Sequence, residues 1–145
     1  MTSWTQRIFP APANARASVG LLLLRIYAGS ALMEHGWAKI QNPMHWMDRG
    51  GDAPPGILQA LAAVSEFFGG LGLVVGLLTP IAAFGIACTM LVAVRKHVGH
   101  GDPFVAHGGP SFEPALGYLV TAALLMLAGP GRFSLDARVF RRSAA

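Results

Sequence analysis

Charged residues are scarce in this 145-residue chain, where they make up 12% of the sequence. Ordinary soluble domains carry about 25%. Hydrophobic residues make up 53%. A soluble fold of this length needs charge to cover its aqueous surface, so the scarcity argues against a soluble protein. The composition instead predicts one domain in a membrane, with short polar loops.

Cysteine is also nearly absent. The single Cys88 excludes an intramolecular disulfide and a paired-cysteine redox motif. The sequence has no haem motif, no cysteine cluster for iron–sulfur, and no nucleotide or flavin fingerprint. Any redox role would therefore need electrons from another protein. The net charge of +4 could suggest nucleic acid, but the arginines concentrate near the two ends, which is a membrane-topology pattern. We expect no nucleic-acid partner.

Four apolar stretches are long enough to cross a bilayer. They cover about 18–40, 56–78, 80–98 and 112–129. The sequence predicts an all-α integral membrane four-helix bundle, antiparallel, with the N- and C-termini on the same side. It divides into a cytoplasmic arm (1–17), the transmembrane domain (18–129) and a basic amphipathic tail (130–145). In the short turn between the second and third spans, Thr79 is expected to cap the following helix and Pro80 to occupy its first turn.

Orientation follows from the distribution of arginine and lysine. The end regions carry six arginines against one acid, namely Arg7, Arg16, Arg132, Arg138, Arg141, Arg142 and Asp136. The opposite loops have a more even balance of charge. The positive-inside rule then predicts a multi-pass protein of the cytoplasmic (inner) membrane with cytoplasmic termini.

The first span contains charged residues that are costly at membrane depth, at roughly 2.5–3.5 kcal/mol each. On a helical projection Arg25, His35 and Lys39 lie within about 80° of one another, which predicts a cationic face toward the bundle. Arg25 lies too far from the other two to share a small site. Its expected partner is a backbone carbonyl near a helix break, a lipid phosphate or a water cavity. Arg95 is likewise assigned to structure or lipid contact.

The second span carries Glu66 near its middle, and an isolated carboxylate there must find a cation or a proton. In an antiparallel bundle it lies near the outer ends of the neighbouring spans. The candidate quinone- or ligand-binding residues are therefore His35, Lys39, Glu66, His97 and Glu113. Histidine and a carboxylic acid beside apolar walls suit a quinone, whose carbonyls accept hydrogen bonds and protons. The alternative is a salt bridge that fixes helix register.

Two further patterns are weaker indicators of function. Histidines near the third loop are metal-ligand types, namely His97, His100 and His107. They match no zinc signature, so exposed loop histidines without a metal are the favoured interpretation. Small residues at a 4-3-4 spacing form a stripe on the second span: Ser65, Gly69, Gly72 and Gly76. Such a stripe favours close helix packing over a ligand groove.

The chain resembles the DoxX family of small four-helix membrane proteins. The resemblance rests on LLLLRIYAGSALMEHGWAKI, on SEFFGGLGLVVGLLTPIAAFGIACTML, on His97 and Glu113, and on the ending LAGPGRFSLD. It implies a four-helix bundle in the cytoplasmic membrane. The family also includes the DoxD-type subunit of thiosulfate:quinone oxidoreductase, a branch that relies on additional protein partners. The resemblance therefore implies much more about fold than about reaction.

Three functions remain open from the sequence. The first is a quinone-associated membrane subunit of a redox system, which would at most be part of an enzyme. The second is a non-enzymatic scaffold that docks a soluble oxidoreductase. A small-molecule carrier ranks last, because the spans show no pair of broken helices. Besides the lipid bilayer, the expected partners are a soluble redox protein and further copies of the chain.

Overall fold

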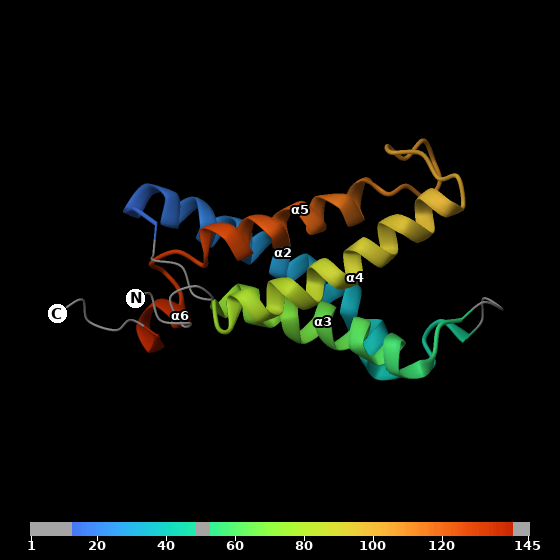
Figure 1. Ribbon diagram of the computed structural model, residues 1–145, viewed down its shortest axis with the longest axis horizontal. Coiled ribbons are helices and arrows are strands. Elements are labelled where there is room, and N and C mark those ends of the chain that lie inside the picture. Colours follow the sequence, from blue (N-terminus) through green and yellow to red (C-terminus); the bar gives the residue numbers. More distant parts are fainter. Residues whose placement is uncertain (1–12, 49–52, 141–145) are drawn as a thin grey trace, which may run out of the picture.

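The computed structural model describes residues 13–48 and 53–140, and every regular element in these ranges is a helix. The helices are α2 (Ala15–Gln41), α3 (Gly56–Val75), α4 (Thr79–Gly99), α5 (Glu113–Ala128) and α6 (Leu135–Val139). Figure 1 shows α2 to α5 side by side along one long axis, with α6 at one end. The all-helical prediction is confirmed. Parts of the predicted arm and tail, residues 1–12 and 141–145, lie outside the described residues.

Local sequence explains where the long helices begin and end. The Asn14 side chain accepts a hydrogen bond from Ala17 N and so caps α2. Gly76 ends α3 with a φ of 70°, a left-handed conformation that glycine adopts without a Cβ penalty. Pro80 lies in the first turn of α4, as expected. The predicted Thr79 cap is wrong, because the side-chain oxygen of Thr79 makes no hydrogen bond.

The tightest helix contact joins α2 to α3 and depends on glycine. A Cβ added at Gly29 would lie 2.6 Å from Gly70 O, and one at Gly70 would lie 2.7 Å from Gly29 O. One at Gly36 would lie 2.6 Å from Phe67 N. Any side chain at these positions would force the two backbones apart. This glycine contact, which the sequence reasoning missed, fixes the neighbours of Lys39 and Glu66.

The small-residue stripe on α3 faces α4. Hypothetical Cβ atoms on Gly69 and Gly72 would meet Ile86 and Ala82 of α4. Ser65 lies against Gly85 in the same way. Gly76 lies past the helix end and does not continue the stripe, since a Cβ there would overlap the Arg25 guanidinium. The stripe therefore packs helices within one chain.

A narrow core lies between the helices, and large apolar side chains cover the outside. Leu32, Leu73, Ile86 and Leu125 are fully buried, one from each of α2 to α5. Apolar residues such as Leu127, at 81% exposed, point outward on the same helices. α2, α3 and α4 are each long and apolar enough to cross a membrane, and α5 is a shorter apolar helix. An apolar exterior over such helices is typical of a protein surrounded by lipid.

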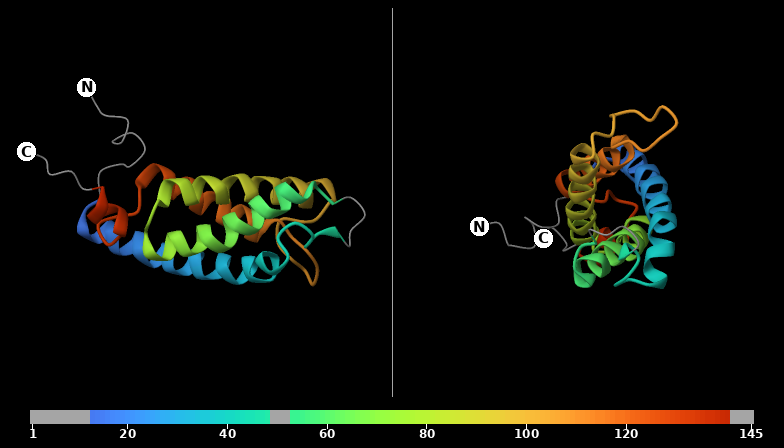
Figure 2. Two further views of the ribbon diagram at one scale, coloured as in Figure 1. Left: turned by 90° about the horizontal axis from the view of Figure 1, so that it is seen from below. Right: turned by 90° about the vertical axis from the view of Figure 1, so that its right-hand side faces the viewer.

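The four helices do not enclose the core evenly. α2 packs extensively on α3, α3 on α4, and α4 on α5, whereas α2 and α5 touch only sparsely. Figure 2, seen along the bundle, shows the four helices arranged as a ring. The boundary between α2 and α5 is therefore the least tightly packed seam of the bundle.

Candidate functional site

A charged pair inside the bundle joins α2 to α3. Lys39 Nζ donates to both carboxylate oxygens of Glu66, at 2.6 and 2.5 Å. The Glu66 side chain is 4% exposed and that of Lys39 is 24% exposed. The close contact of Gly36 with Phe67 brings Lys39 and Glu66 together. Gly36 precedes Lys39 by less than one helical turn, and Phe67 follows Glu66 directly. The carboxylate is thus buried but paired, as an intramembrane acid must be.

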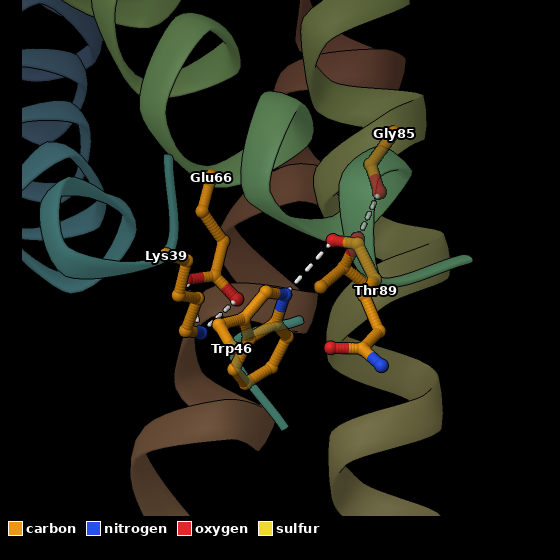
Figure 3. A network of polar contacts seen from close by, with 6 residues as sticks. Lys39, Trp46, Glu66, Gly85 and Thr89 are labelled. Carbon is orange, nitrogen blue, oxygen red and sulfur yellow. Dashed lines mark hydrogen bonds and ion pairs between the residues drawn. The ribbon is translucent and has the colours of Figure 1, made fainter. Parts of the chain in front are cut away.

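The loop after α2 folds back over this pair. Figure 3 shows the Trp46 ring beside Lys39 and Glu66, and Lys39 Nζ lies 4.7 Å from the ring centre. This is the geometry of a cation–π contact. Trp46 Nε1 donates to Gln59 O at 3.0 Å, which ties the loop to α3. Trp46 therefore covers the charged pair from the loop side.

Gln59 holds the same loop through its side chain and is itself buried. Its Oε1 accepts from Met47 N at 2.8 Å, and its Nε2 donates to Asp48 Oδ1 and Pro54 O. Asp48 also contacts His45 Nδ1 at 2.6 Å. The hydrogen bonds from Gln59, and then from His45, hold the pKa of the Asp48 carboxyl below its usual range. The part of the loop nearest the charged pair is thus a hydrogen-bonded structure.

The seam between α2 and α5 carries two further polar rings. His35 on α2 meets Tyr118 on α5 edge to face, with ring centres 5.9 Å apart. Sequence reasoning missed Tyr118, since a lone tyrosine in an apolar helix is an ordinary core or interface residue. The His35–Tyr118 ring contact therefore joins α2 to α5 across the seam.

The remaining candidate residues lie apart from this pair. His97 Nδ1 contacts Asp102 Oδ2 at 2.7 Å, and Glu113 is exposed at the start of α5. The structure therefore divides the predicted five-residue cluster. Arg95, His100 and His107 are exposed. Within residues 13–48 and 53–140, no three histidine, cysteine or acidic side chains form a group that could hold a metal ion.

A second buried charge, Arg25, lies near the α6 end of the bundle. Its side chain is fully buried, and its guanidinium donates to Leu73 O and Phe133 O. Backbone carbonyls are one of the three kinds of partner expected from the sequence, and they are the partners that the described residues supply. The acceptor at Phe133 belongs to the segment between α5 and α6. The residues after α5 are therefore hydrogen-bonded to the bundle.

Asp136 binds the segment after α5 to the turn between α3 and α4. Its carboxylate accepts from Leu78 N at 2.6 Å and Thr79 N at 2.8 Å, and its own N–H donates to Gly76 O. It thus performs the helix-capping role that the sequence assigned to Thr79. Asp136 also interacts electrostatically with Arg25. We call Arg25, Gly76, Phe133 and Asp136, with the backbone groups that they bind, the tail clasp.

A comparison with protein-family models matches the DoxX model over residues 20–108. The match covers more than half of the chain.

This chain belongs to the DoxX family.

The resemblance seen in the sequence is thereby confirmed. A search of curated proteins finds no match, and neither does a search of solved structures. The DoxX match includes Arg25, Lys39 and Glu66 but ends before α5. Tyr118 and Asp136 therefore lie outside the matched region of this DoxX protein.

Proposed function

We propose that this DoxX protein is a quinone-associated membrane subunit of a redox system. Two observations carry the proposal. The Glu66 carboxylate is buried and paired with Lys39, and the His35 and Tyr118 rings meet at the loosest seam of the same bundle. Such a seam suits a ligand that arrives through the lipid and has an apolar tail and a polar head. A quinone has both parts, and its headgroup suits the polar side chains near this seam.

Each residue would have a distinct task at such a site. The Tyr118 hydroxyl and a His35 ring nitrogen are hydrogen-bond donors suited to quinone carbonyl oxygens. Lys39 holds the Glu66 carboxylate in place, and Trp46 limits the access of loop-side water to both. A bound quinone would accept two electrons and two protons. The electrons would come from a soluble redox partner, because the sequence of this chain carries no redox-cofactor fingerprint.

We also propose the cytoplasmic membrane, with an antiparallel bundle and both ends of the chain in the cytoplasm. Exposed arginines near the α6 end support this orientation, namely Arg16, Arg132 and Arg138. The opposite end exposes Glu113 and Asp48 beside its cations. A bias of this kind is what the positive-inside rule uses.

The test is mass spectrometry of the organic extract from gently purified protein. We expect one quinone per chain in the wild type and in Glu113→Gln, which removes an exposed carboxylate. We expect its loss in Glu66→Gln and a weaker retention in Tyr118→Phe. Tyr118→Phe removes only a hydroxyl, so it separates ligand loss from unfolding. Bulk lipid alone in every extract, or equal quinone in all four proteins, would contradict the proposal.

A second candidate is a scaffold for a soluble oxidoreductase, and the loop between α4 and α5 favours it. This loop extends from the end of the bundle in Figure 1, and it exposes Phe104 and Val105 at 52% and 43%. Replacing both with serine should abolish cross-linking to a soluble protein while leaving the quinone content unchanged. An unchanged cross-linking pattern would argue against this role.

A further inference from the structure

The short helix α6 and the residue stretch before it present an unusual surface at one end of the bundle. Phe133, Leu135 and Val139 are exposed there, at 50%, 38% and 64%. Arg132 and Arg138 are exposed among them. We call these five residues the α6 surface. Large apolar side chains and arginines therefore share one patch at the end where the long helices stop.

The tail clasp determines which way this surface faces. On a helix, Arg138, Leu135 and Val139 fall within an arc of about 100°, while Asp136 points away from the centre of that arc. Asp136 is 3% exposed and bound to the α3–α4 turn. Arg25 holds the preceding backbone at Phe133 O. The patch is thus fixed to the bundle by buried charges and does not depend on a free tail.

The charge of this end is one-sided. Three exposed arginines lie near it in the described residues, namely Arg16, Arg132 and Arg138. The acid there is Asp136, which is buried and already accepts two hydrogen bonds. The side chain of Arg132 donates from Nε to Ala13 O and otherwise stays exposed. The other end of the bundle, by contrast, mixes exposed acids and bases. A ligand for the α6 surface should therefore be anionic.

We propose that the α6 surface binds anionic phospholipid headgroups of the leaflet at this end of the bundle. The patch lies where apolar helices leave the bilayer, so a membrane surface already adjoins it. Apolar side chains that enter the headgroup region, flanked by arginines, are the usual means of such binding.

The experiment measures lipid selectivity directly. The full chain, purified in detergent, is given equal amounts of phosphatidylglycerol and phosphatidylcholine with the same acyl chains, and retained lipid is counted by native mass spectrometry. We expect a preference for phosphatidylglycerol. Arg132→Gln/Arg138→Gln should reduce that preference roughly ten-fold or more, since each basic side chain at an anionic surface is expected to contribute about five-fold.

A matched control removes two cations at the other end of the bundle. Arg95→Gln/Lys96→Gln makes the same change in net charge on the exposed end of α4 and should leave the preference intact. Equal losses in both double variants would mean that net charge alone attracts the lipid, and would overturn the proposal. So would a wild type without selectivity. Unchanged thermal unfolding of the variants in detergent shows that the tail clasp has survived the substitutions.

Discussion

The two ends of this bundle each bury a charge, and they satisfy it in different ways. Glu66 meets the ammonium of Lys39, a side chain on the neighbouring helix. Arg25 meets backbone carbonyls, one of them in the segment after α5, and its electrostatic partner Asp136 binds backbone N–H groups. The first arrangement is a pair of side chains. The second joins three parts of the chain.

The difference indicates separate roles for the two charges. A side-chain pair can be replaced by two apolar side chains, since no backbone hydrogen bond depends on it. The Asp136 carboxylate cannot be replaced in this way, because Leu78 N and Thr79 N would lose the acceptor that they bind. We therefore expect the tail clasp to be required for folding and the Lys39–Glu66 pair to be available for function. Variants at the two ends can test this contrast.

The largest effect is expected from Asp136→Ala. It removes the acceptor for Leu78 N and Thr79 N, and hydrogen bonds to a charged group contribute about 1.5–3 kcal/mol each. We predict a loss of about 3–6 kcal/mol in the free energy of unfolding, measured in detergent micelles. Asp102→Ala is the control, because its partner His97 is partly exposed, and it should cost less than about 1 kcal/mol. Equal losses of free energy of unfolding in the two variants would contradict the prediction that Asp136 stabilises the fold more than Asp102 does.

Glu66→Ala should cost about 3–5 kcal/mol, because it leaves Lys39 partly buried without its partner. The double variant Lys39→Met/Glu66→Met should recover most of that loss. The equivalent exchange at the other end is Arg25→Met/Asp136→Leu. It should recover none of the free energy of unfolding that Asp136→Ala loses. Unfolding of all three variants in the same detergent is the measurement, and a recovered Arg25→Met/Asp136→Leu protein would show that the two ends are equivalent.

Gly76→Ala should cost about 2–4 kcal/mol. Gly76 has a φ of 70°, which penalises other residues, and the new Cβ would overlap the Arg25 guanidinium. Gly117→Ala on α5 is the control, because nothing lies within 4 Å of its Cβ position. That change should be neutral or stabilising by up to about 1 kcal/mol, since alanine favours helix. A small loss of stability in Gly76→Ala would mean that the Arg25 side chain can move aside without weakening the fold.

The smallest effect concerns the loop that covers the charged pair. The pKa of Asp48 is lowered in the folded loop, so its contribution to loop stability is complete above the unfolded value of about 3.9 and is lost as the pH falls through the lower folded value. Acidification should therefore release the Trp46 indole from Gln59 O. The indole N–H resonance of Trp46 reports this directly. Asp48→Asn should remove the transition, and a transition that persists would have another cause.

Much of the fold was predictable because the apolar stretches are long. The predicted spans and the observed helices α2 to α5 differ by at most three residues at each end. Helix geometry also put Lys39 near Glu66, since adjacent spans joined by a short loop bring their outer halves together. The same reasoning placed His97 and Glu113 near Glu66. In the structure His97 instead contacts Asp102, and Glu113 is exposed. Membrane depth alone does not determine which face of a helix a residue occupies.

The sequence by itself determined the membrane class, the DoxX family and the helices, because each depends on hydrophobic runs and short motifs. Only the tertiary structure decided where Arg25 finds its partners. Arg25 and Phe133 are 108 positions apart, and no periodicity links an arginine in the first span to a carbonyl after the last one. Tertiary packing brings them together, because Gly131 and Arg132 contact Ser18 of α2 and Asp136 binds the turn between α3 and α4.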